Sequence, residues 1–294
     1  MGALNLEGSL ELVPCPLCGA DDPAPRWEKD GLRIVTCRAC ALVYVNPRPT
    51  MEALARLYND QVISWTDYYV EHAPEDRRSF ARRLDLIERH VEQGSERRLL
   101  ELGCGTGTFL QVATGRGWSG RGIDVNAESV GVCRAAGLDV VCGTFPHPTF
   151  DGQAFDLAVM SDFIEHVTDP LAVLRATRER LAPEGLLFIT TPDVGSPLAR
   201  AAGLRWPHLK PVEHLTYFSR ATMRALLDRA GFEPVVLRSM GRVRNLGLAL
   251  ERLEHFSWRL SRATRALVPR AWAEKVHLTI NPGDEMAVLA RRRE

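Results

Sequence analysis

The sequence predicts an α/β fold, in which helices cover both faces of a largely parallel sheet, preceded by a small metal-binding unit. Three observations support this prediction. A buried strand over residues 99–102 runs into a glycine-rich turn, an acid (Asp124) ends the next strand, and two Cys-x-x-Cys pairs lie near the N-terminus. Glycine is needed where a strand turns sharply into a helix and where the backbone approaches a ligand closely.

The glycine-rich turn has three glycines spaced two residues apart. Residues 97–108 read Arg-Arg-Leu-Leu-Glu-Leu-Gly-Cys-Gly-Thr-Gly-Thr, whereas the last two glycines of the dinucleotide fingerprint are three apart. Residues 101–115 contain no Lys or Arg that would bind a phosphate. Asp124 can accept hydrogen bonds from both ribose hydroxyls of an adenosine group. These features favour an adenosine cofactor that carries no phosphate.

This pattern resembles motif I of the class I S-adenosylmethionine (SAM) methyltransferases, and the resemblance extends over residues 97–240. Further matches are the fourth strand at 154–162, the next helix at 171–181 and the fifth strand at 183–192, followed by late segments at 214–219 and 225–232. The resemblance implies a Rossmann-like sheet with SAM as cofactor. The cofactor-binding residues that it implies are Glu101, Gly103, Cys104, Gly105, Thr106, Gly107, Asp124, Val125, Phe145, Ser161 and Asp162.

Four of the seven cysteines have zinc-ribbon spacing. Cys15 and Cys18 form one pair, Cys37 and Cys40 the other, and 18 residues separate the pairs. Four thiolates complete a tetrahedron around one Zn²⁺, so we expect a structural ion. Two disulfides or a redox pair are the alternatives, and the lack of an apparent secretory signal favours zinc. A short hairpin turning at Asp30-Gly31 is expected between the pairs.

The chain divides into three predicted parts. Residues 11–49 form the zinc ribbon, residues 50–95 a helical linker or lid, and residues 96–294 the SAM-binding domain. In the linker, Thr50 is the expected N-cap of a helix over 51–58, and residues 77–92 suit an amphipathic helix. The aromatic segment 64–69 would either cover the cofactor or pack against the sheet.

A helical insertion is predicted at about residues 241–283. Apolar residues recur there at spacings of four and three, which is typical of one helical face. The insertion could cap the substrate pocket, pair in a homodimer or contact an anionic partner, and a packed lid is favoured because the apolar stripe must be buried. The stripe consists of Ala249, Leu253, Phe256, Leu260, Ala263 and Leu267.

Composition narrows the class of protein. The 294 residues carry a formal net charge of zero, which gives no global signal for nucleic acid or an anionic membrane. No stretch approaches the ~20 consecutive apolar residues of a membrane span. We therefore expect a cytoplasmic protein acting on a small molecule.

Asp162, Glu165, His166 and His214 are the candidate groups for chemistry at the acceptor. A helix opening after the fourth strand would place the first three together. The run resembles the Glu-x-x-Glu-His of small-RNA 2′-O-methyltransferases and ubiquinone-pathway O-methyltransferases, which implies a Mg²⁺ or Mn²⁺ site completed by His214. Asp162 departs from that pattern by one methylene. A metal-free histidine base, which we take as the working expectation, and a purely structural role are the alternatives.

The function predicted is SAM-dependent O-methylation of a small metabolite or glycan-type intermediate. The segment after the ribbon, residues 41–49, resembles methyltransferases of bacterial antibiotic, sugar and surface-glycan pathways. An RNA methyltransferase that grips RNA through a basic ribbon is the alternative. A non-catalytic partner protein is a third class, which the intact glycine turn and Asp124 disfavour. The ribbon's basic residues are Arg26, Lys29, Arg33, Arg38 and Arg48.

Overall fold

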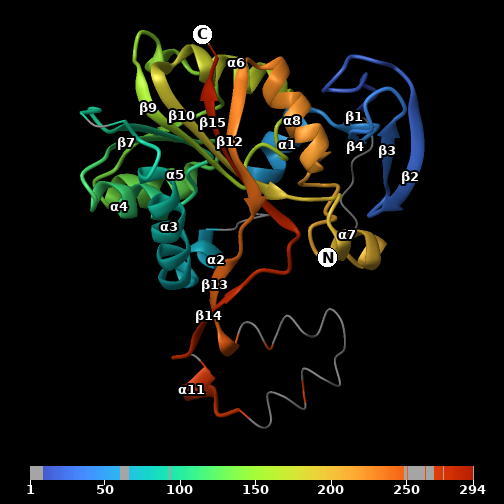
Figure 1. Ribbon diagram of the computed structural model, residues 1–294. Helices are drawn as coiled ribbons and strands as arrows, with labels where there is room; N and C mark the ends of the chain where they lie inside the picture. Colours follow the sequence, from blue (N-terminus) through green and yellow to red (C-terminus); the bar gives the residue numbers. More distant parts are fainter. Residues whose placement is uncertain are drawn as a thin grey trace.

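A seven-stranded sheet forms the centre of the computed structural model, which describes residues 9–59, 66–92, 94–247, 250, 262, 268–273 and 275–293 (Figure 1). The strand order is β12-β15-β10-β9-β6-β7-β8. β15 runs antiparallel to both of its neighbours, β10 and β12, and all other neighbouring pairs in this sheet are parallel. The strands are β6 (Arg98–Leu102), β7 (Ser119–Asp124), β8 (Asp139–Cys142), β9 (Phe155–Ser161), β10 (Leu181–Pro192), β12 (Phe232–Ser239) and β15 (Glu285–Arg292).

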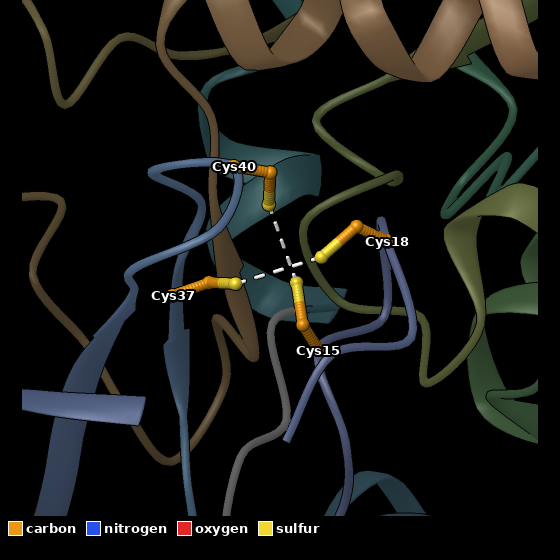
Figure 2. Close-up of side chains that lie close together, drawn as sticks. All are labelled: Cys15, Cys18, Cys37 and Cys40. Carbon is orange, nitrogen blue, oxygen red and sulfur yellow. Dashed lines mark hydrogen bonds between the residues drawn. The ribbon is translucent and has the colours of Figure 1, made fainter. Parts of the chain in front are cut away.

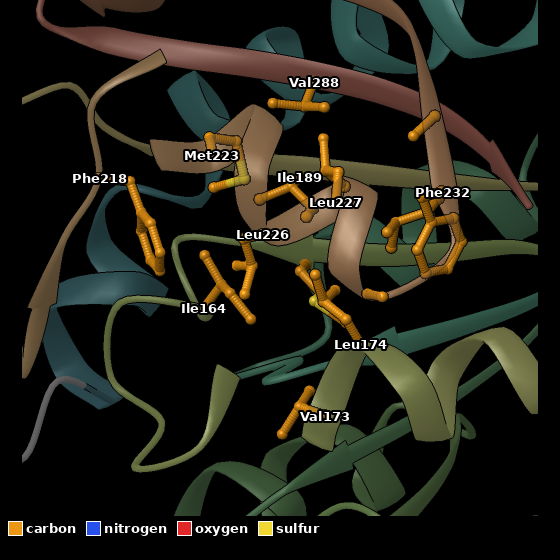
Figure 3. Packing of buried hydrophobic residues seen from close by; sticks show 14 of the residues in the cluster. Ile164, Val173, Leu174, Ile189, Phe218, Met223, Leu226, Leu227, Phe232 and Val288 are labelled. Atoms are coloured by element: carbon orange, nitrogen blue, oxygen red, sulfur yellow. The ribbon is translucent and has the colours of Figure 1, made fainter. Parts of the chain in front are cut away.

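Helices cover both faces of this sheet, as the sequence predicts. Buried side chains of α3 (Ala73–Glu88), α4 (Thr108–Thr114) and α5 (Ala127–Ala135) share one cluster with one face of the strands. Those of α6 (Pro170–Glu179) and α8 (Arg220–Arg229) pack on the other face. Figure 3 shows Met223, Leu226 and Leu227 of α8 packed beside Ile189 and Val288 of the sheet. Alternate residues of each strand therefore supply two separate apolar layers.

Local capping fixes where the helices begin. Asp169 accepts a hydrogen bond from the Ala172 N–H at 2.8 Å, and Pro170 follows it as the first helical residue, so α6 starts there. Ser219 and Thr222 form a capping box at the start of α8. No helix in the described part of the chain is long and apolar enough to cross a membrane. Shorter helical segments are α7 (Pro197–Ala202) and two 3-10 turns, Pro148–Phe150 and Gly203–Arg205.

The N-terminal ribbon is a separate sheet of order β11-β4-β3-β2. Its strands are β2 (Pro23–Lys29), β3 (Leu32–Cys37), β4 (Val43–Val45) and β11 (Thr216–Tyr217), with β1 (Leu10–Glu11) paired separately to β5 (Arg48–Pro49). Asp30 and Gly31 form the predicted hairpin turn with φ of 52° and 75°. The fourth strand, β11, comes from the catalytic domain, which the sequence did not indicate.

Three helices lie in the described part of the linker. Thr50 caps α1 (Met51–Asn59) as expected, because its hydroxyl accepts a hydrogen bond from the Ala53 N–H at 3.2 Å. α2 (Thr66–Glu71) follows, and α3 begins and ends four residues earlier than predicted. Residues 64 and 65 of the predicted aromatic segment 64–69 lie outside the described residues, whereas residues 66–69 belong to α2.

The insertion begins and ends in strands, so its predicted helical character is wrong at both ends. β13 (Arg242–Asn245) pairs with β14 (His277–Ile280) in an antiparallel ladder that projects from the sheet (Figure 1). Arg-Val-Arg-Asn and His-Leu-Thr-Ile alternate polar and apolar residues, a pattern of period two that suits a strand. One short helix, α11 (Arg270–Ala273), is described between them, and the predicted apolar stripe falls outside the described residues.

Candidate active site

A cavity of about 980 Å³ opens at the carboxyl ends of β6, β7 and β9. This is the edge of a parallel sheet at which ligands bind, because the strand-to-helix turns converge there. The linker contributes to its wall through α1, α2 and α3, and the insertion through β13 and β14. The predicted cofactor residues that line it are Glu101, Gly103, Cys104, Gly105, Thr106, Asp124, Val125, Phe145, Ser161 and Asp162.

The glycine turn leaves no room for side chains at two positions. Gly103 has φ of 70°, and a Cβ there would lie 2.4 Å from the Phe163 ring. Gly107 is not among the described residues that line the cavity. Instead it precedes α4 with φ of 74°, and a Cβ would lie 2.4 Å from the Leu138 side chain. Gly107 therefore has a packing role at the start of α4.

Asp124 is held at the end of β7 by backbone donors. The Gly105 N–H donates to Oδ2 at 2.8 Å and the Asn126 N–H donates to Oδ1 at 2.9 Å. Burial raises the pKa of this carboxyl against the effect of those bonds. A buried carboxylate fixed in this way at the cavity wall suits a pair of vicinal hydroxyls.

Two buried ionisable side chains near the glycine turn have polar atoms without hydrogen-bond partners among the described residues. Arg83 of α3 is 2% exposed, and its Nε and Nη1 have no hydrogen-bond partner among the described residues. Glu101 Oε2 is likewise unpaired, and burial raises the Glu101 pKa well above its ordinary value. Sequence reasoning missed Arg83, although its spacing from Phe80 and Ile87 placed it on the apolar face of its helix.

Glu165, His166 and His214 meet in the same cavity. Their candidate ligand atoms lie within 4.8 Å of one another, and the two imidazole rings stand nearly perpendicular with centroids 4.7 Å apart. His214 Nδ1 bonds the His208 carbonyl at 2.8 Å, so Nδ1 carries the proton and Nε2 remains available. The Thr191 hydroxyl donates to Glu165 Oε2 at 3.0 Å, whereas Oε1 has no partner within the described structure.

Burial controls protonation in this cluster. It raises the pKa of Glu165 to about 8, with the nearby charge of Asp162 as a second cause. It lowers the pKa of His166 to about 4 and that of His214 well below the ordinary value. At neutral pH both imidazoles are therefore uncharged, which is the form that accepts a proton or binds a cation.

Asp162 does not belong to this cluster, which corrects the four-ligand prediction. Its carboxylate Oδ1 lies 2.8 Å from Arg242 Nη2, and Arg242 Nε also lies 2.8 Å from Glu285. The expected helix is absent too: Phe163 to His166 form a turn, in which the His166 N–H bonds the Phe163 carbonyl at 3.0 Å. The helix starts only at Pro170, because its cap lies there. The sequence analysis did not pair Arg242 with Asp162, because Arg242 lies at the start of the predicted insertion, far from Asp162 in the sequence.

The four ribbon cysteines converge on one point (Figure 2). The Sγ atoms of Cys15 and Cys40 are 3.5 Å apart, as are those of Cys18 and Cys37. A disulfide requires about 2.05 Å. Four sulfurs bonded to Zn²⁺ at about 2.3 Å would be about 3.8 Å apart, so the cysteine group fits the ion. Burial raises the pKa of Cys15 to about 11, a cost that a bound cation would offset.

The chain belongs to the methyltransferase-domain family, whose model matches residues 69–237. It is 29% identical over 179 residues to a ubiquinone biosynthesis O-methyltransferase of Ruegeria pomeroyi, covering 52% of this chain and 71% of that protein. It superposes on a SAM-dependent methyltransferase from Thermotoga maritima with a TM-score of 0.53 at 18% identity, covering 82% and 100% of the two chains.

A further similar structure is the plantazolicin methyltransferase in complex with SAH, with a TM-score of 0.53 at 15% identity and coverage of 82% and 95%. The fold, the family and the cavity together identify this chain as a SAM-dependent methyltransferase. The residues around the cavity fit that cofactor: the glycine turn and Asp124 suit the adenosine. The unpaired Oε2 of Glu101, which lines the cavity, suits the ammonium of its methionine end.

Asp124→Ala should weaken SAM or SAH binding by about 1–3 kcal/mol, because two ribose hydroxyls lose a charged acceptor. Isothermal titration calorimetry measures the change. Asp139→Ala is the matched control, since Asp139 lies on the next strand and pairs with Arg121 at the surface. Equal affinity in the Asp124 variant and the parent protein would remove the assigned role of Asp124.

Proposed function

We propose that the protein transfers the methyl group of SAM to a hydroxyl oxygen of a small organic molecule. The observation that carries this proposal is the Glu165–His166–His214 cluster, which lines the same cavity as the glycine turn and Asp124. The relative from Ruegeria pomeroyi is named for O-methylation in ubiquinone biosynthesis, which supports oxygen as the acceptor atom.

The reaction requires alignment and removal of one proton. An acceptor hydroxyl displaces the sulfonium from the methyl carbon, so the oxygen must lie in line with the carbon–sulfur bond. We propose that His166 and His214 orient the hydroxyl, whose proton passes to solvent as the methyl group is transferred. Glu101 would bind the ammonium at the methionine end of SAM, and Asp124 would bind its ribose.

The cluster also fits a divalent cation, Mg²⁺ or Mn²⁺, held by Glu165, His166 and His214. His214 is oriented by the His208 carbonyl and His166 by a bond to the Glu213 backbone, an outer shell typical of metal-binding histidines. The unpaired Oε1 of Glu165 supplies the third ligand. A bound ion would lower the pKa of the acceptor hydroxyl. We propose this arrangement over the metal-free base, because it alone gives Oε1 a partner.

A chelator tests the proposal. EDTA should abolish methylation of a hydroxylated aromatic or sugar acceptor, and Mg²⁺ or Mn²⁺ should restore it while the zinc content stays unchanged. Activity that is indifferent to EDTA would instead assign proton removal to a histidine alone. Incubating the protein with total RNA and tritiated SAM tests RNA as the alternative acceptor. Tritium incorporated into the RNA would overturn the small-molecule proposal.

Glu165→Gln should stabilise the metal-free protein increasingly as the pH rises. The Glu165 pKa is about 8 in the folded chain and ordinary in the unfolded chain. The folded state therefore binds more protons between pH ~4.5 and ~8, and the free energy of unfolding falls across that window. Gln carries no such titration, so the variant's Tm should exceed the parent's by at least about 2 °C at pH 8.5, with a smaller difference at pH 5.

Differential scanning fluorimetry measures both effects of that substitution. Mn²⁺ should raise the Tm of the parent and leave the Glu165→Gln variant nearly unchanged, since only the parent offers the third ligand. An equal rise in both proteins would exclude Glu165 as a ligand.

A further inference from the structure

We propose that the zinc ribbon positions His214 and Glu165, by adding β11 to its own sheet. The segment 206–217, which carries His214 and is here named the acceptor segment, rests on the ribbon. Its start also contacts the edge of the central sheet, where Trp206 Nε1 donates to Asp284 at 2.9 Å. The ribbon is thus a positioning element of the active site. Its catalytic consequence rests on the function proposed for His214, whereas the physical linkage does not.

A backbone ladder joins the ribbon to the acceptor segment. β11 pairs with β4 in antiparallel register, with Thr216 opposite Tyr44 and Tyr217 opposite Val43. The Val45 N–H extends the ladder by donating to the Leu215 carbonyl at 2.9 Å. Leu215 directly follows His214, so the ladder reaches the residue next to the imidazole.

The same peptide units continue to Glu165. The N–H groups of Leu215 and Thr216 donate to the Glu165 carbonyl at 2.8 and 3.1 Å. The Leu215 backbone therefore bonds the ribbon on its carbonyl side and Glu165 on its amide side. A displacement of β4 would move both ends of the cluster, because buried backbone groups are rarely left without partners.

Side chains anchor the start of the acceptor segment on the ribbon as well. Lys29 Nζ donates to the Leu209 carbonyl at 2.6 Å. The His208 carbonyl, which holds His214 Nδ1, is next to Leu209. One buried cluster joins the two parts, with Trp206, Leu209 and Tyr217 of the acceptor segment packed with Leu32, Ile34, Val43 and Val45 of the ribbon.

The cysteine group controls the strand that makes this contact. Cys37 ends β3, and Cys40 lies in the turn that leads to β4. The Cys37 N–H bonds the Leu42 carbonyl and the Ala41 N–H bonds the Cys37 carbonyl, both at 2.8 Å. If the thiolates of Cys37 and Cys40 bind the same zinc ion, they hold this turn in one conformation. The turn in turn sets the register of β4 against β3. Only one strand, β4, separates β3 from β11.

Two substitutions test the linkage, read by backbone hydrogen exchange, zinc content and SAM affinity. Cys40→Ser should lose zinc, and amides of residues 214–217 should exchange at least tenfold faster, while β7 stays protected. Cys142→Ser, at an exposed thiol, is its control.

Lys29→Met should keep zinc. Exchange over residues 206–217 should become about tenfold faster and kcat should fall about tenfold, because one charged hydrogen bond is lost. Its SAM affinity should be unchanged, and Arg33→Met, at an exposed site on β3, is its control.

The outcomes separate the linkage from the proposed function. Unchanged exchange over residues 206–217 in both Cys40→Ser and Lys29→Met would overturn the linkage. Faster exchange together with full activity in Lys29→Met would overturn the positioning role. A fully active His214→Ala variant would overturn the function proposed for that histidine, and the exchange result would still decide the linkage.

Discussion

Replacing His166 with alanine should lower kcat by about 10²- to 10⁴-fold, the range expected when a group that helps to activate the acceptor hydroxyl is removed. SAM affinity should stay within about twofold, because His166 lies on the acceptor side of the cavity and the cofactor turn remains intact. His214→Ala should behave in the same way. Stopped-flow or radiometric methyl-transfer assays give kcat, and calorimetry gives the affinity.

The pH profile adds a second test of the histidines. Since burial lowers the His166 pKa to about 4, activity should persist well below pH 6.5, the value at which an exposed imidazole would lose its function. His90→Ala is the control, because His90 lies at the end of α3 and outside the cavity lining. A kcat unaffected by either active-site substitution would leave the cluster with a structural role only.

Cys15→Ser should abolish zinc binding and unfold the ribbon over residues 11–49. Structural zinc contributes about 10–16 kcal/mol to small metal-dependent folds, far more than the ribbon's short strands can supply without it. Metal analysis should find one zinc per parent chain and none in the variant, and limited proteolysis should cut the variant within the ribbon. Zinc-free parent protein with Cys15 and Cys18 disulfide-linked in fresh lysate would contradict the zinc assignment.

Most of the central fold could be predicted because periodicity and turn chemistry agree along residues 97–240. The buried run ending at Leu102, the glycine turn, Asp124 and the Asp169-Pro170 helix start each act over a few residues, so their signals are local. The Cys-x-x-Cys spacing is likewise a local signal, because each pair of cysteines lies within four residues. Local signals of this kind are visible in one sequence.

The parts that could not be predicted depend on contacts between distant segments. β11 is two residues long and becomes a strand only because the β4 edge is available. Asp162 fitted a ligand run by spacing, yet Arg242, from an insertion 80 residues later, takes its carboxylate. Arg83 sits on an otherwise ordinary amphipathic helix, and its unpaired guanidinium becomes visible only once the helix is packed.

The bond between α3 and β13 has a consequence for how ligands enter and leave. Arg244 is 3% exposed and its Nη1 lies 2.7 Å from Asp76, while the Val243 N–H donates to Ser79 at 2.8 Å. Separating these elements would leave buried charge unpaired, at about 3–5 kcal/mol. We therefore expect the cavity wall formed by α3 and β13 to remain closed during turnover. On the α2 side, Tyr69 is 41% exposed, and the Thr66 hydroxyl forms a neutral hydrogen bond with the Ser129 hydroxyl at 3.0 Å. We expect spent cofactor to exit there.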